Sequence, residues 1–273
     1  MSEQYDLRFG GIARLYGANA TAVFKQAHVC VIGIGGVGTW VAEGFARSGF
    51  GEITLIDMDD ICVTNINRQI HALQSTVGQS KIEVMAARIA DINPECKVNI
   101  IEDFVTRDTV AEHLTNRFNY VVDAIDGVSS KAAIVAHCKR NKIKVITIGG
   151  AGGQIDPTKV TTGDVNKTFN DPLMRKLRAT LRRHYGFSRN AARVYGVSCV
   201  YSTEQLRYPQ ADGSICQQKI FADGDTKLDC EGGFGAAAMV TATFGFVAVS
   251  KVIEKMLRAA ERKAQEALKD SEQ

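Results

Sequence analysis

The sequence lacks the signatures of secreted and disulfide-stabilised proteins. Its seven cysteines, at positions 30, 62, 96, 138, 199, 216 and 230, form no CxxC pair and have no regular framework spacing. The N-terminus, Met-Ser-Glu-Gln-Tyr-Asp, has neither the basic nor the apolar region of a signal peptide. We therefore expect a cytoplasmic protein whose thiols are reduced.

Long apolar runs and a strong net charge are also missing. The longest apolar run, residues 234–250, has 17 residues with two glycines and two threonines, whereas a membrane-spanning helix needs about 20 apolar residues. We expect a buried helix there and no membrane span. The net charge is only +3, but residues 167–193 hold eight Lys or Arg against one Asp. Such a stretch is typical of a surface that faces phosphate, and equally of a solvated helix.

Apolar runs typical of strands alternate with helical patterns in the first half of the chain. The alternation predicts βαβ units, with strands at residues 29–34, 53–57, 98–101, 120–124 and 144–148. Strand-like segments return at 155–165 and 197–201, around a helix at 171–183, with no linker between the halves. We predict an α/β fold: a Rossmann-like, mostly parallel twisted sheet with flanking helices, in which the second half adds strands to the same globule. Residues 1–265 should form this single domain, and residues 266–273 a frayed tail.

Four glycines lie between the first predicted strand and a helix. They are Gly33, Gly35, Gly36 and Gly38, and Asp57 follows the last of them by 19 residues, at the end of the second strand. Gly33 and Gly35 let the backbone approach phosphate oxygens, Gly38 permits close helix packing, and Asp57 can accept hydrogen bonds from ribose hydroxyls. The pattern predicts a nucleotide site but does not separate NAD from ATP.

Polar residues after the second strand favour ATP. Asn65, Arg68 and Lys81 offer one polar and two cationic groups, which a triphosphate needs and a nicotinamide ring does not. Asp123 and Asp126 lie at the end of the fourth strand, where ligands of open α/β sheets collect. One of these two carboxylates could therefore hold Mg²⁺.

These motifs resemble the adenylating family that includes the ubiquitin-activating enzymes and the molybdopterin- and thiamine-pathway adenylyltransferases. The family shares GxGGxG, DxDxVxxxNLxRQ, a lysine and a later aspartate, which here are residues 33–38, 57–69, Lys81 and Asp126. The resemblance implies attack of a substrate carboxylate on the α-phosphate of ATP, with Mg²⁺ bound by Asp126. The catalytic residues it implies are Arg68, Lys81 and Asp126, and the nucleotide-binding residues are Gly33, Gly35, Gly36, Gly38, Asp57, Asp59, Asn65, Arg68, Gln69 and Lys81.

Two departures from the family pattern concern zinc and an arginine. The paired CxxC motifs of many relatives are absent, so we expect no structural zinc. The usual Arg-Tyr-x-Arg-Gln appears as Arg8-Phe-Gly-Gly-Ile-Ala-Arg14, so either Arg14 or Arg8 takes the place of the arginine that reaches the ATP of the partner subunit in relatives. The resemblance thus implies a homodimer with shared sites.

Three stretches, at residues 8–17, 149–157 and 234–245, resemble one subgroup of the family, the tRNA threonylcarbamoyladenosine dehydratases. The implied reaction adenylates the threonyl carboxylate of a modified adenosine beside the tRNA anticodon, and a cyclic hydantoin then forms with net loss of water. Two alternatives stay open. One is an adenylyltransferase that activates the C-terminus of a sulfur-carrier or ubiquitin-like protein, and the other is an NAD-binding dehydrogenase or nucleotide-sensing module.

Further candidate residues lie in the second half of the chain. On the helix predicted from residue 171, an apolar stripe of Met174, Leu177 and Leu181 leaves four arginines on the flanks as candidates for tRNA phosphates: Arg175, Arg178, Arg182 and Arg183. Cys230 precedes the apolar helix and could be reactive, although cyclisation requires no thiol. Residues 149–153 could cradle an anion, hold a monovalent cation or form a tight turn. A cysteine-desulfurase or sulfur-acceptor protein is a further possible partner.

Overall fold

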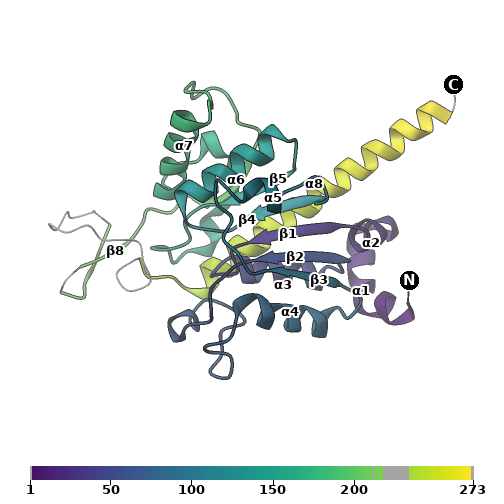
Figure 1. Ribbon diagram of the computed structural model, residues 1–273, viewed down its shortest axis with the longest axis horizontal. Coiled ribbons are helices and arrows are strands. Elements are labelled where there is room, and N and C mark those ends of the chain that lie inside the picture. Colours follow the sequence, from purple (N-terminus) through teal and green to yellow (C-terminus); the bar gives the residue numbers. More distant parts are fainter. Residues whose placement is uncertain (1, 211, 218–233, 272–273) are drawn as a thin grey trace.

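The computed structural model describes residues 2–210, 212–217 and 234–271 and is built on one large sheet (Figure 1). The sheet has seven strands in the order β3-β2-β1-β4-β5-β7-β6, and all are parallel except β6, which runs antiparallel to β7. The strands are β1 His28–Ile32, β2 Glu52–Ile56, β3 Lys97–Ile101, β4 Tyr120–Asp123, β5 Val145–Ile148, β6 Val160–Asp164 and β7 Ser198–Ser202. A separate hairpin pairs β8 Tyr208–Pro209 with β9 Ile215–Cys216.

The central strands are buried because helices cover both faces of the sheet. All four residues of β4 and of β5 are buried, whereas β3, at the edge, is only partly covered. Continuous apolar runs are what a parallel strand buried on both sides requires. The α/β fold, the five first-half strands and the addition of second-half strands to the same sheet are therefore confirmed.

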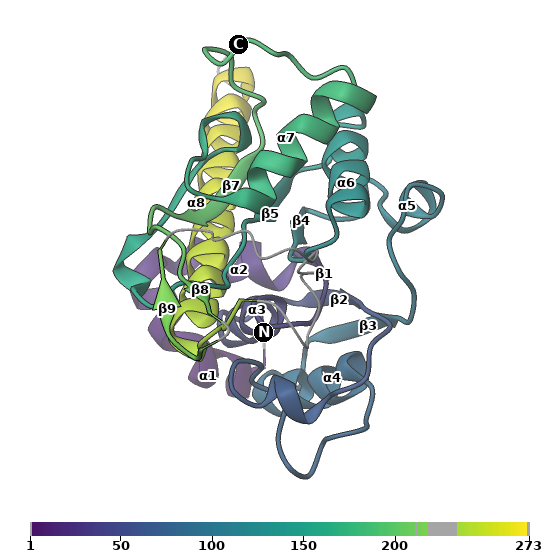
Figure 2. The ribbon, with the colours of Figure 1, turned by 90° about the vertical axis from the view of Figure 1, so that its left-hand side faces the viewer.

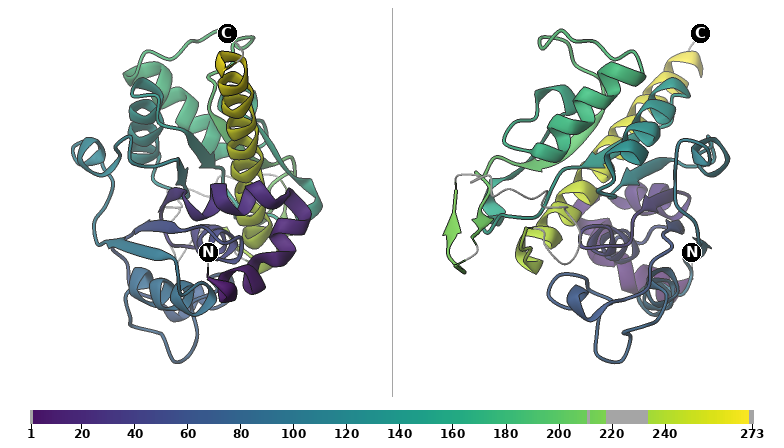
Figure 3. Two further views of the ribbon diagram at one scale, coloured as in Figure 1. Left: turned by 90° about the vertical axis from the view of Figure 1, so that its right-hand side faces the viewer. Right: turned by 60° about the vertical axis from the view of Figure 1, so that its left-hand side comes forward.

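Two hydrophobic cores lie between the sheet and the helices that cover it. One core contains residues from α3, α4 and α8, and the other contains residues from α5, α6 and α7. Figures 2 and 3 show α6 beside α7, with the long α8 on the other side of the sheet. The helices are α1 Glu3–Tyr16, α2 Ala18–Lys25, α3 Gly38–Arg47, α4 Lys81–Ile92, α5 Val110–His113, α6 Val128–Arg140, α7 Pro172–His184 and α8 Ala238–Ser271, with short 3-10 turns at Val63–Asn65, Pro157–Lys159 and Val165–Lys167.

Helix α8 covers the predicted buried helix from Ala238 onward, without residues 234–237, and extends well beyond its predicted end. Val240, Phe244 and Val252 are fully buried in the core against the sheet, while the C-terminal part projects outward in Figure 1. The helix continues to Ser271, through residues for which the sequence predicted a frayed tail. Ala, Glu, Gln and Lys dominate that part, and these residues favour a helix without packing. None of the described helices is long and apolar enough to cross a membrane.

Candidate functional site

Most of the predicted nucleotide-binding residues lie at one edge of the sheet. The glycine loop directly follows β1, Asp57 directly follows β2, and Asp126 lies three residues after β4. Because β1 lies between β2 and β4 and is parallel to both, their carboxyl ends meet at the same edge. We call this edge, with its loops, the nucleotide edge.

The glycine loop is closed on itself so tightly that two of its positions exclude any side chain. A Cβ at Gly38 would lie 1.7 Å from the carbonyl oxygen of Gly33. Gly33 has φ +85°, and a Cβ there would lie 2.9 Å from Ile125. By contrast, a Cβ at Gly35 would meet no atom nearer than 4.0 Å. Gly33 and Gly38 are therefore required by the fold, whereas the open space at Gly35 is available to a ligand.

Asp57 ties the glycine loop to the loop after β2. Its carboxylate accepts hydrogen bonds from the backbone N–H of Ile34 at 2.5 Å and of Asp59 at 2.8 Å. The side chain of Asp59 in turn accepts a 2.7 Å hydrogen bond from the Lys81 ammonium, which is only 8% exposed. Lys81 lies at the start of α4, where its charge is held near the nucleotide edge by a carboxylate that is itself half exposed.

Arg68 extends over the glycine loop. A Cβ at Gly36 would lie 3.5 Å from the Arg68 side chain, so the guanidinium group lies beside the loop backbone. The Arg68 guanidinium donates to the carbonyl of Thr64 at 2.8 Å, and its backbone carbonyl accepts from Trp40 Nε1 at 2.9 Å. Thr241 of α8 donates to the same carbonyl at 3.3 Å. These contacts hold Arg68 in place, and its guanidinium retains donors for an anion.

Three buried polar side chains support the same loops. Asn65 accepts from the backbone N–H of Cys62 at 3.0 Å, and Gln69 is 5% exposed with no partner for its Oε1 among the described residues. His71 donates from Nε2 to the carbonyl of Ile34 at 3.1 Å, and burial lowers its pKa to about 4. His71 is therefore a neutral core side chain.

The structure separates the two candidate carboxylates that follow β4. Asp123 is fully buried and accepts from the Lys131 ammonium at 3.0 Å and from Thr147 Oγ1 at 2.6 Å; burial raises its pKa. Asp126 is exposed and makes no hydrogen bond or ion pair with another described residue. Of these two, Asp126 alone offers carboxylate oxygens without a partner among the described residues, and oxygen ligands are those that Mg²⁺ prefers. The described residues contain no cluster of three or more His, Cys, Asp or Glu that could hold a metal.

Asp123 was one of the two candidates for Mg²⁺, but its buried ion pair with Lys131 was not predicted. Lys131 donates to both Asp123 and Thr147, so it joins the ends of β4 and β5 beneath the loops. A lysine in the middle of a helical segment reads as a surface residue, because the sequence does not reveal that its partner comes from the adjacent strand.

The basic helix α7 has the apolar stripe that its sequence predicts. Met174, Leu177 and Leu181 are fully buried. Of the four arginines, two hold the fold together: Arg178 donates to the carbonyl of Val165, and Arg182 donates to Tyr195 and Asn166. The other two, Arg175 and Arg183, are exposed without a recorded partner in the described structure.

Arg8 and Arg14 lie far from the glycine loop of their own chain. Both are exposed on α1, and Tyr5 of that helix donates to the carbonyl of Gly49, just before β2 begins. Figure 1 shows α1 at the end of the sheet where the strands start. The two arginines therefore lie at the edge opposite the nucleotide edge.

The glycine-rich turn after β5 is fixed by Asp171, the N-terminal cap of α7. Its carboxylate accepts from the backbone N–H of Gly150 at 3.0 Å and of Met174 at 2.9 Å, and burial raises its pKa. The carbonyls of Gly150 and Gly153 accept hydrogen bonds from Gln154 and Arg207. The predicted Cys230 lies outside the described residues.

Comparisons with known proteins agree with this geometry. The ThiF family profile matches residues 11–271. The chain is 57% identical over 262 residues to tRNA threonylcarbamoyladenosine dehydratase of Escherichia coli K12, covering 96% of this chain and 98% of that protein. It is 54% identical to the protein of the same name from Haemophilus influenzae, covering 94% and 95%.

A solved structure shows the same fold with a nucleotide. The crystal structure of E. coli tRNA N6-threonylcarbamoyladenosine dehydratase, TcdA, in complex with ATP superposes with a TM-score of 0.86 at 54% identity, covering 96% of this chain and 98% of that one. The sequence motifs, the architecture and the family profile thus agree over nearly the whole chain. The chain belongs to the ThiF family.

Proposed function

We propose that this protein uses ATP to dehydrate tRNA threonylcarbamoyladenosine to its cyclic form, a hydantoin, in the cytoplasm. The observation that carries the proposal is the 57% identity to a dehydratase of that name, which extends over nearly the full length of both chains. The nucleotide edge supplies the groups that this chemistry needs: an open glycine loop, two cations and an exposed carboxylate.

In the first step, a carboxylate oxygen of the threonyl group attacks the α-phosphorus of ATP. A new oxygen–phosphorus bond forms, and the bond to pyrophosphate breaks. We assign Arg68 and Lys81 to the phosphates, because cations fixed by protein hydrogen bonds stabilise developing charge without reorganising. Asp57 would bind the ribose, and Asn65 and Gln69 would shape the pocket beside the phosphates. Asp126 would hold Mg²⁺, which neutralises phosphate charge when bound.

In the second step, the carbamoyl nitrogen attacks the activated carbonyl carbon of the same group. The carbon–nitrogen bond forms, AMP leaves with the carboxylate oxygen, and the nitrogen loses a proton. ATP is thereby converted to AMP and pyrophosphate, and the nucleoside loses the elements of water. Because the nucleophile and the electrophile belong to one molecule, the protein need only hold them close and exclude competing water.

The proposal predicts a product of defined mass. Purified protein incubated with ATP, Mg²⁺ and tRNA that carries the linear modification should yield a nucleoside lighter by one water, as measured by mass spectrometry. Omission of ATP should leave the mass unchanged. An unchanged mass with ATP, on verified substrate, would contradict the proposal. Pyrophosphate exchange triggered by a small protein with a Gly-Gly tail would support the alternative activator, and tight NADH binding with indifference to ATP would support the dehydrogenase or sensor.

We further propose a homodimer in which Arg8 or Arg14 completes the site of the partner. The proposal rests on the position of α1, which puts both arginines at the edge opposite their own glycine loop. A two-fold dimer can bring that edge of one subunit to the nucleotide edge of the other. A monovalent cation at residues 149–153 stays a prediction. A sulfur-transfer partner also stays a prediction, because neither the adenylation step nor the ring closure consumes sulfur.

Mixing two inactive variants tests the shared site. Arg68→Ala disables the site of its own chain, whereas Arg14→Ala would disable the site of its partner. After refolding or co-expression in equal amounts, half of the dimers should be mixed, and each mixed dimer should hold one intact site. We expect recovery of about a quarter of wild-type dehydration, as random pairing into two-fold dimers dictates.

The same mixture with Arg8→Ala identifies which arginine acts. Substitution of the arginine that completes the partner's site should inactivate the single variant. Mixing that variant with Arg68→Ala should restore part of the dehydration activity. Full activity of both single variants, or no recovery with either, would contradict a site shared between subunits.

A further inference from the structure

A basic cleft lies at the edge of the sheet opposite the nucleotide edge. It is about 740 Å³ in volume and opens between α8 and the segment that joins α6 to β5. Tyr120, the first residue of β4, lines it, as do Val145 at the start of β5 and Val197 just before β7. The cleft is therefore formed by the amino ends of the same strands whose carboxyl ends face the nucleotide loops.

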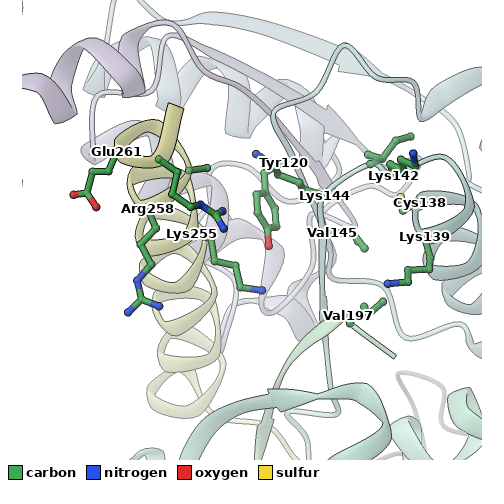
Figure 4. A pocket seen from close by; sticks show the side chains of 14 residues that line it. Tyr120, Cys138, Lys139, Lys142, Lys144, Val145, Val197, Lys255, Arg258 and Glu261 are labelled. Atoms are coloured by element: carbon green, nitrogen blue, oxygen red, sulfur yellow. The ribbon is translucent and has the colours of Figure 1, made fainter. Parts of the chain in front are cut away.

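Cations approach this cleft from both walls. One wall carries Lys139, Lys142 and Lys144, and the α8 wall carries Lys255, Arg258 and Arg262. In Figure 4 the ammonium groups of Lys255 and Lys139 point toward one another, with Tyr120 between the walls. Three carboxylates lie nearby. Glu261 also lines the cleft, Glu254 pairs with Arg258 at 2.7 Å, and Asp164 accepts from the backbone N–H groups of the lining residues Gly196 and Val197.

Most of these cations have no counter-ion among the residues that the structure describes. Lys139, Lys142, Lys144 and Arg262 are exposed, and no hydrogen bond or ion pair is recorded for their charged groups within the described residues. Lys255 is half-buried and donates to Ser198, and burial lowers its pKa. Unpaired like charges that face one another are unfavourable unless an anion lies between them, so the cleft has the charge pattern of a polyanion site.

The basic surface continues from the cleft toward the nucleotide edge. Gly196 lines the cleft, and the loop that leads to it contains the exposed Arg189 and Arg193. That loop follows α7, whose exposed Arg183 lies at the cleft end and whose exposed Arg175 lies near Asp171 and the turn after β5. A helix of 13 residues spans about 20 Å. A ligand that reaches from one edge to the other is therefore larger than a nucleotide.

We propose that the basic cleft binds sugar-phosphate backbone of the substrate tRNA, away from the adenosine that is modified. The inference rests on the proposed function, because it takes tRNA as the substrate. Exposed Lys and Arg on two open walls suit phosphate contacts, which position RNA without reading its bases. The cleft would hold the body of the tRNA while the nucleotide edge acts on the modified base.

The test removes one cation from each wall. The double variant Lys144→Gln with Arg262→Gln keeps a polar side chain at both positions and deletes two charges that have no recorded partner in the described part of the chain. The control is Lys97→Gln with Arg107→Gln, which deletes two exposed charges at and beyond β3, the edge strand remote from β5 and β7. Lys97 forms a surface ion pair with Glu52 at 2.9 Å, so this control also shows what loss of a paired charge does. Wild type and both variants are compared for dehydration of tRNA at several salt concentrations.

We expect the cleft variant to raise KM for tRNA about tenfold at low salt, with kcat and KM for ATP unchanged. The dependence of log KM on log salt should become shallower by about 1.5, as expected when two phosphate contacts are lost. The control variant should behave as wild type. Equal KM and equal salt dependence of the cleft variant and wild type would overturn the proposal.

A competition arm separates RNA from a small anion. Binding of inorganic pyrophosphate is measured for the wild type and for the cleft variant. Weaker pyrophosphate binding by the cleft variant, together with unaltered tRNA kinetics, would also overturn the proposal and would assign the cleft to a free phosphate compound. A wild-type protein that does not change the mass of modified tRNA would instead contradict the proposed function. The two failures are therefore distinguishable.

Discussion

Arg68→Ala is expected to lower ATP-dependent activity about 100- to 1000-fold, as loss of one fixed donor to a developing negative charge commonly does. The side chain lies 3.5 Å from the position of a Cβ at Gly36, so its guanidinium is beside the loop expected to hold the phosphates. Trp40 and Thr241 hold its backbone carbonyl, and alanine keeps both of those contacts. The loss should therefore arise from the missing charge and not from a displaced loop.

The measurement is dehydration of modified tRNA at saturating ATP, together with the thermal stability of the variant. The Tm should stay within about 3 °C of wild type, because the guanidinium is exposed and its hydrogen bonds are made to Thr64 and its neighbour Asn67. Arg107→Ala, which removes an exposed arginine with no recorded partner in the described structure, should leave both quantities unchanged. If Arg68→Ala retained near-normal activity, ATP would not be bound as proposed.

Gly38→Ala is expected to destabilise the protein by about 3 kcal/mol or more. The added Cβ would lie 1.7 Å from the carbonyl oxygen of Gly33, and both partners of that overlap are backbone. Relief of the overlap requires α3 to move away from β1, which breaks the loop. For a chain of this size we expect a fall in Tm of about 10 °C and loss of ATP binding.

Two other glycines provide matched controls. Gly10→Ala, in the middle of α1, meets no atom nearer than 3.5 Å and should be neutral or stabilising by up to about 1 kcal/mol. Gly35→Ala meets nothing nearer than 4.0 Å, so the fold should tolerate it while the Cβ enters the space left for phosphate. Calorimetry with ATP should then find a stable Gly35→Ala protein with weakened binding. Normal stability of Gly38→Ala would contradict this account of the loop.

The sheet and the nucleotide edge could be predicted because their information is local in the sequence. An apolar strand, a glycine loop and the acid that ends the next strand follow one another within about 30 residues, and parallel pairing then brings them to one edge. Asp57, Asp59 and Lys81 are joined by hydrogen bonds in the structure, as a motif-based assignment to one site requires.

Features built from distant segments could not be predicted in the same way. The sequence shows that Arg178 and Arg182 flank an apolar stripe, but not that Thr168, Asn166 and Tyr195 accept their hydrogen bonds. The basic cleft likewise combines Lys144 with Arg262, more than a hundred residues away. Charge counted along the chain cannot distinguish cations used inside the fold from cations left free for a ligand.

Helix α8 extends from the nucleotide edge to the basic cleft and so fixes the distance between them. Thr241 contacts the backbone of Arg68, and Arg258, 17 residues later, lines the basic cleft, which corresponds to about 25 Å along the helix axis. A continuous helix packed on the sheet changes its length very little. The distance between the nucleotide edge and the basic cleft is therefore set by the number of helical residues between them. Under the proposal, a substrate that occupies both sites must span that distance. The enzyme would then discriminate against isolated nucleosides and short fragments, which are too short, without contacting any base outside the anticodon loop.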